Sequence, residues 1–107
     1  MIRNTITEKR GSIATPFYEF PEGHVDKYKS PLPGTALRFY DNMITRTLTI
    51  WFSTIDELIA FADIPDIKAA SDARVKYNAE NYIKFNRAIE YYAPEEYDRY
   101  LLENQTV

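Results

Sequence analysis

Apolar and polar residues alternate through much of the first half of the chain, which is typical of strands that bury one face. Residues 2–9 and 12–20 predict two strands. Pro16 has no backbone donor, so we expect the second strand at a sheet edge or at a bulge. The proline- and glycine-rich residues 21–34 then predict a long loop that is either a surface connection or a binding loop.

The clearest strand signal is a hairpin formed by residues 35–40 and 43–52. Asp41-Asn42 forms its turn, because Asn and Asp tolerate the positive φ of a two-residue turn. If Tyr40 pairs with Met43, one face is apolar except for Arg46 and forms the core. That face carries Leu37, Phe39, Ile44, Leu48, Ile50 and Phe52, and the other carries Arg38, Tyr40, Met43, Thr45, Thr47, Thr49 and Trp51.

Helix signals dominate the second half of the chain. The cap Ser53-Thr54, followed by Glu57, predicts a helix that runs to about residue 63 and is ended by Pro65. Apolar residues then recur at helical spacing over residues 66–93, which predicts either one long helix or a helix broken near Ala70-Ser71. Its buried side is expected to carry Val75, Ala79, Tyr82, Phe85, Ile89 and Ala93.

A last helix is predicted from Pro94, a residue suited to the first helical position, and Tyr97, Tyr100 and Leu101 are expected to anchor it. Together these elements predict an α+β fold in a single domain of residues 1–107. We expect an antiparallel sheet of three or four strands in residues 2–52. Two or three helices in residues 54–103 pack on one of its faces. The chain thus divides into a β half, 1–53, and a helical half, 54–107.

The composition leaves little room for catalytic or metal chemistry. With no cysteine and one histidine, the chain can form neither a thiolate zinc site nor a centre of several imidazoles. Its glycines and serines match none of the motifs G-x-x-x-x-G-K-[ST], G-x-G-x-x-G or G-x-S-x-G. We therefore expect a protein that is not an enzyme and uses no metal or cofactor, and we interpret His24 as a surface histidine in a turn.

The net charge of −3 argues against a general nucleic-acid binder. Residues 1–53 carry seven Lys or Arg against five Asp or Glu, whereas residues 54–107 carry six against eleven, so the acidity lies in the second half. No apolar run is long enough to span a membrane, and the first residues lack the apolar core of a signal peptide. We expect a cytoplasmic protein with no membrane partner.

Carboxylates and tyrosines gather near the end of the chain, where residues 90–103 carry a charge of −4. Such a helical surface could bind a basic protein surface or imitate the phosphates of DNA, although an ordinary solvated helix shows the same pattern. We expect a small interaction protein, a regulator or inhibitor of viral, phage or mobile-element origin, whose protein partner has a basic surface. Its expected contact residues are Tyr77, Lys84, Glu90, Tyr91, Glu95, Glu96 and Asp98.

Two alternatives follow from the same sequence. An aromatic and basic sheet face could stack single-stranded bases, although the chain is acidic and lacks an RNP1 motif. In the other alternative, an exposed face joins copies of the chain in a homo-oligomer, as in a structural or assembly subunit. The residues of the nucleic-acid alternative are Lys27, Lys29, Arg38, Tyr40 and Trp51.

Overall fold

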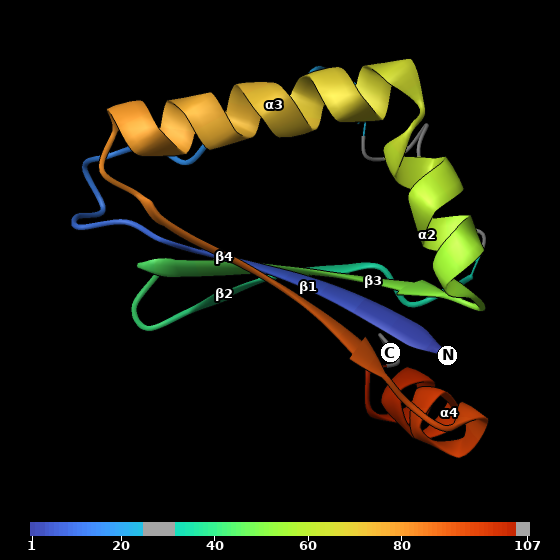
Figure 1. Ribbon diagram of the computed structural model, residues 1–107. Helices are drawn as coiled ribbons and strands as arrows, with labels where there is room; N and C mark the ends of the chain where they lie inside the picture. The colour runs from blue at the N-terminus through green and yellow to red at the C-terminus, as the bar shows by residue number, and fades with distance from the viewer. Residues whose placement is uncertain (25–31, 105–107) are drawn as a thin grey trace.

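A computed structural model describes residues 1–24 and 32–104. Four antiparallel strands form one sheet in the order β2-β3-β1-β4, and three helices follow in the second half of the chain (Figure 1). The α+β class is confirmed. The strands are β1 (Ile2–Lys9), β2 (Ala36–Tyr40), β3 (Thr45–Phe52) and β4 (Lys84–Tyr91), and the helices are α2 (Ile55–Ala62), α3 (Pro65–Glu80) and α4 (Pro94–Glu103).

The helices lie on both faces of the sheet rather than on one. α2 and α3 cover one face, and α4 packs across one end of the opposite face (Figure 1). No helix within residues 1–24 and 32–104 has the length and apolar character needed to cross a membrane.

The predicted helix over residues 66–93 is wrong in its second half. α3 ends at Glu80, where the backbone N and the Nδ2 of Asn81 both donate to the carbonyl of Tyr77. Tyr82 then takes a left-handed φ of 55° and is exposed, and the chain reverses into β4. Pairing with β1 along eight residues outweighs the local helical pattern, so the second half of the chain is not purely helical.

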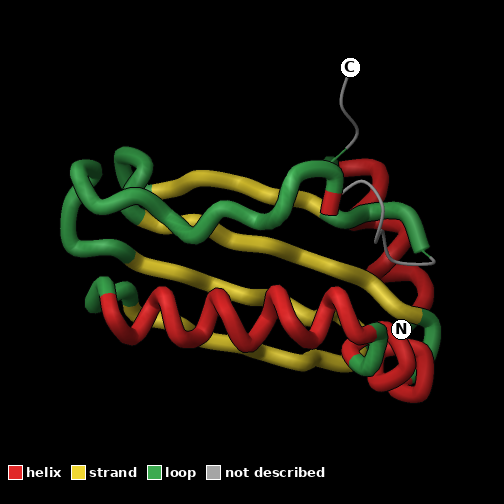
Figure 2. Tube along the Cα trace, turned by 90° about the horizontal axis from the view of Figure 1, so that it is seen from above, coloured by secondary structure: helices red, strands yellow, loops and turns green. Residues whose placement is uncertain are grey.

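Residues 12–20 do not form the predicted second strand. They follow an irregular path beside α3, across the face of the sheet that α3 covers (Figure 2). Ser12 forms a local turn, because its Oγ and its carbonyl accept from the amides of Ala14 and Thr15. The carbonyl of Pro16 accepts a hydrogen bond from the Tyr77 hydroxyl of α3. The segment is thus held by turns and by α3 instead of by a neighbouring strand.

The hairpin has a longer turn than predicted. The residues of its two strands lie on the predicted faces, but Leu37 and Phe39 of the expected core face are 47% and 43% exposed. Residues 41–43 all have positive φ, so Tyr40 pairs with Thr45 rather than with Met43. A shift of two residues returns each side chain to the same face. The even-numbered residues of β3 therefore face α2 and α3, whereas Trp51 lies on the opposite face.

The predicted helix starts are confirmed. Thr54 Oγ1 accepts from the Glu57 amide at 3.2 Å, and Glu57 Oε2 accepts from the Ser53 amide at 2.9 Å. α4 begins at Pro94, as predicted. A side-chain cap at Thr54 therefore marks the start of α2, and a proline at the first helical position marks the start of α4.

Candidate functional site

Four aromatic rings fix α4 on the sheet. The Trp51 ring lies 5.1 Å from the Tyr97 ring, 5.2 Å from the Tyr100 ring and 5.6 Å from the Tyr92 ring, between ring centroids. Trp51 is only 1% exposed. The Tyr97 hydroxyl donates to the carbonyl of Pro33 at 2.6 Å, and burial raises the pKa of that hydroxyl. This end of the sheet is a closely packed aromatic cluster, with two of the predicted anchors of α4 in it.

Glu90, one of the predicted contact residues, forms hydrogen bonds with other side chains of the protein. Its Oε1 accepts from Arg3 Nη2 at 2.9 Å, and its Oε2 accepts from the Tyr92 hydroxyl at 2.8 Å. The guanidinium of Arg3 also donates to the Tyr92 hydroxyl and lies 4.6 Å from the centre of the Tyr92 ring. Hydrogen bonds from Arg3 and then from Tyr92 hold the pKa of the Glu90 carboxyl below its usual value. Both oxygens of Glu90 therefore have partners within the protein.

The outward side of α4 carries two exposed acids, an exposed arginine and an exposed leucine. Arg99, four residues after Glu95, lies on this side with a side chain that is 63% exposed. Glu95, Asp98 and Leu102 follow the spacing i, i+3, i+7 and so share this side of the helix. We call these three residues the α4 ridge. Leu102 is 69% exposed, and Tyr91, at the end of β4, is 71% exposed.

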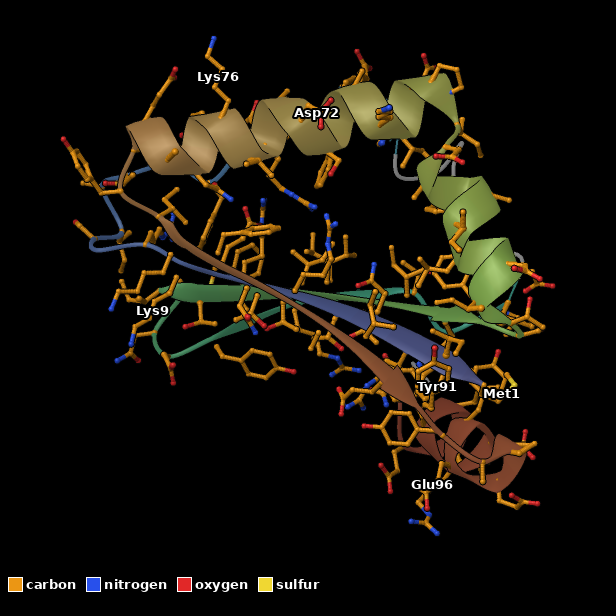
Figure 3. All side chains as sticks on the ribbon, in the orientation of Figure 1. Met1, Lys9, Asp72, Lys76, Tyr91 and Glu96 are labelled. Carbon is orange, nitrogen blue, oxygen red and sulfur yellow. The ribbon has the colours of Figure 1, made fainter. Side chains whose placement is uncertain are left out.

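The neighbouring acid Glu96 is less available for a partner than the two acids of the α4 ridge. It projects from α4 away from the sheet (Figure 3). Its Oε2 pairs with Nη1 of Arg99 at 3.3 Å, one helical turn later. The ion pair cancels part of the acidity of this helix.

Tyr77 and Lys84 do not lie with these acids. Because α3 ends before Lys84, both residues lie at the end of α3 that is remote from α4 (Figure 1). The Tyr77 ring packs 5.8 Å from the Tyr18 ring, and its hydroxyl donates to Pro16. The predicted helical surface is therefore divided, with Tyr91 and the acids of α4 at one end and these two residues at the other.

The residues of the nucleic-acid alternative are not brought together as a stacking platform. Trp51 is buried beneath α4, and the Arg38 guanidinium donates to Oδ1 of Asn104. Tyr40 remains exposed on the edge strand β2. Lys27 and Lys29 lie outside the described residues.

A cavity of about 290 Å³ lies between the sheet and helices α2 and α3. α3 turns small and polar residues inward, since its buried residues are Ala70, Arg74 and Asn78. The predicted buried side of this helix is wrong at Val75, which is exposed. Ala70 adds too little volume to fill the space above the sheet. The apolar wall of the cavity includes Ile6, Leu48, Ile50, Leu58, Phe61 and Ile67.

Three buried polar side chains form a cluster beneath α3. Glu8 Oε1 accepts from Arg46 at 2.7 Å and 2.9 Å, and Glu8 Oε2 accepts from Asn78 Nδ2 at 2.8 Å. Glu8 and Arg46 are each less than one-tenth exposed. Opposite charges in direct contact offset much of the cost of taking both from water. The pair is electrically neutral as a unit.

Arg74 is the buried charge without a carboxylate partner. It is 3% exposed, and no described carboxylate lies within 4.0 Å of its guanidinium. Its Nε has no hydrogen-bond partner, while the guanidinium lies 5.3 Å from the Phe85 ring centre and 5.6 Å from the Phe20 ring centre. Burial lowers the pKa of Arg74. Sequence periodicity gave no signal for this residue, because it placed a different side of the helix inward.

Comparisons with protein-family models, with curated proteins and with solved structures found no match. In the described ranges, no three His, Asp or Glu side chains are grouped so that they could hold a metal ion. Two features of the molecule have the character of binding sites: the α4 ridge, and the cavity with Arg74.

Proposed function

We propose that this chain is a small, non-enzymatic interaction protein that binds the basic surface of a protein partner through the α4 ridge and Tyr91. The observation that carries this proposal is the stripe of Glu95, Asp98 and Leu102 on the side of α4 opposite its tyrosine anchors. A helix held by buried aromatic rings presents such a stripe without a large loss of conformational entropy on binding. The exposed leucine and tyrosine supply apolar contact area, and the two acids supply charge complementarity.

Ion pairs within the protein reduce the number of carboxylates that remain free to contact a partner. Glu90 is paired with Arg3, and Glu96 with Arg99. Neither Glu95 nor Asp98 forms an ion pair with a described residue. These two carboxylates are therefore the ones that we expect to meet Lys or Arg side chains of the partner. A regulator or inhibitor of viral, phage or mobile-element origin, acting in the cytoplasm, fits an acidic, cysteine-free domain of this size.

The test reverses the charge of the α4 ridge with the double substitution Glu95→Lys and Asp98→Lys. Affinity capture from a nuclease-treated lysate, with the wild-type chain as bait, identifies a protein partner, whose binding to each variant is then measured by calorimetry. We expect the double variant to bind at least about tenfold more weakly, because charges at an interface become repulsive. Circular dichroism checks that it remains folded.

The matched control is Glu19→Lys with Glu80→Lys, which makes the same change in net charge at two exposed acids away from α4. This control should bind like the wild type. Equal weakening by both double variants would mean that only net charge matters. Full binding by the Glu95/Asp98 variant, or no protein partner in any capture, would remove the ridge from the proposal.

A further inference from the structure

We propose that the cavity beneath α3 binds a monocarboxylate with an apolar chain, its carboxylate at Arg74 and its chain against the aliphatic wall. This site is separate from the α4 ridge and does not depend on the proposed protein partner. Helices α2 and α3, which line it, lie on the opposite face of the sheet from α4 (Figure 1). The site joins a largely apolar cavity with one buried cation, Arg74, that forms no ion pair with a described residue.

The charges of the buried side chains favour a ligand that carries a single negative charge. Glu8 forms an ion pair with Arg46, so the three buried side chains Glu8, Arg46 and Arg74 together carry one net positive charge. A buried ion is strongly destabilising unless it is paired and hydrogen-bonded. A monoanion at Arg74 would neutralise it, whereas a phosphate monoester would bring a charge nearer −2 into the same space.

A hydrogen-bond donor on the cavity wall is available to a carboxylate head group. The Nε of Arg74, a residue that lines the cavity, is buried without a partner. Buried polar atoms in folded proteins normally have partners, so this unmatched donor indicates a ligand with an acceptor oxygen. A guanidinium donates well to the planar oxygens of a carboxylate.

The rest of the wall suits an apolar chain. Aliphatic and aromatic side chains from the sheet, α2 and α3 line the space, including Ile6, Ile50, Phe61 and Ile67. Its volume of about 290 Å³ is roughly ten times the share of one water molecule in the liquid. A medium-length alkyl chain fits such a volume, and burying it is favourable. The cavity also borders the charged residues Asp63, Lys68, Asp72 and Arg87.

Octanoate is the probe for the test, with isoleucine methyl resonances as the readout. We expect saturable shifts of the methyl signals of Ile6, Ile50 and Ile67 at millimolar concentrations. The indole signal of Trp51, on the opposite face, serves as an internal reference and should stay in place. Octanol tests the need for charge, and octyl phosphate tests the class of anion.

Two variants should abolish or weaken binding, and one matched variant should not. Arg74→Met removes the guanidinium at similar length and should weaken octanoate roughly tenfold or more. Ala70→Leu fills the cavity and should remove the shifts. Lys76→Met removes a positive charge from the outer side of the same helix, where Lys76 points away from the sheet (Figure 3), and should bind like the wild type.

The outcomes separate the parts of the proposal. Absence of methyl shifts in the wild type overturns the site. Equal binding of octanol, or unchanged octanoate affinity of Arg74→Met, shows that Arg74 does not hold the head group. Tighter binding of octyl phosphate overturns the assignment of a carboxylate. Dispersed amide spectra of each variant establish that it is folded, so that lost binding reports on the cavity.

Discussion

The two faces of the sheet are covered in opposite ways. Beneath α4, three tyrosine rings surround Trp51 with ring centroids 5.1–5.6 Å from it. Beneath α3, a cavity of about 290 Å³ remains beside the buried Arg74. The difference follows from what each helix turns toward the sheet: aromatic rings in α4, and small or polar residues in α3. We infer that the α4 face contributes mainly to stability. The α3 face contributes less to stability, because it keeps a space in which a ligand can bind.

Removal of the central ring of the α4 face should have the largest effect. Trp51→Ala leaves a cavity among three tyrosines, and we expect it to lower the free energy of unfolding by about 3–5 kcal/mol. Urea denaturation followed by circular dichroism measures this loss. The comparison variant is Ile67→Ala on the wall of the α3 cavity, which should cost less, because part of its surroundings is already empty. Equal costs would mean that the two faces are packed alike.

Substitutions that add atoms to each face also test whether the α4 face is packed more closely than the α3 face. Gly34 has a φ of 107°, and a Cβ there would lie 3.3 Å from Leu101 Cδ2 and from Trp51 Cδ1. Gly34→Ala should therefore cost about 1–3 kcal/mol through backbone strain and crowding. Ala70→Leu, which adds more atoms beneath α3, should change the free energy of unfolding by less than about 1 kcal/mol, since the added atoms enter a cavity.

Urea denaturation of both variants under one set of conditions gives the comparison directly. A large decrease in the free energy of unfolding of Ala70→Leu would show that the α3 face has no room for a side chain of that size. It would also weaken the case for a ligand there. A neutral Gly34→Ala would show that the Trp51 cluster can shift to accept a methyl group. Either result would remove the asymmetry between the faces.

Local signals in the sequence predicted a large part of this fold. Thr54 with Glu57, and Pro94, placed two helix starts, and the alternation of residues placed β1 and the faces of the hairpin. The sequence did not reveal β4, because its pairing with β1 joins residues as far apart as Ile2 and Tyr91. Such non-local pairing leaves no mark in a local pattern.

The candidate sites also differ in how far the sequence could predict them. The exposed acids of α4 could be predicted, because a proline and acids at a helix start are local signals. The engagement of Glu90 could not, since its partner Arg3 comes from the other end of the chain. The cavity and the burial of Arg74 also escaped prediction, because they depend on which side of α3 meets the sheet.

The smallest expected effect concerns the polar network at the edge of the α4 face. In the folded protein the pKa of Glu90 lies below its ordinary value of 4.5, because Arg3 and Tyr92 donate to the carboxylate. A depressed pKa stabilises the fold above the ordinary pKa, and this stabilisation is lost as the pH falls through the folded-state pKa. Since the Glu90 side chain is 43% exposed, solvent screens the pair, and Glu90→Gln should cost less than about 1 kcal/mol at pH 7.

This cost should shrink below the ordinary pKa of 4.5, and also in high salt. Unfolding of the wild type and of Glu90→Gln by urea at neutral and acid pH measures the difference. Glu19→Gln, at an exposed acid outside the network, is the control and should show little cost at either pH. A cost for Glu90→Gln that rivals Trp51→Ala, or that persists in acid, would mean that charge rather than aromatic packing secures the α4 face. A small cost that acid removes would leave the Trp51 cluster as its main source of stability.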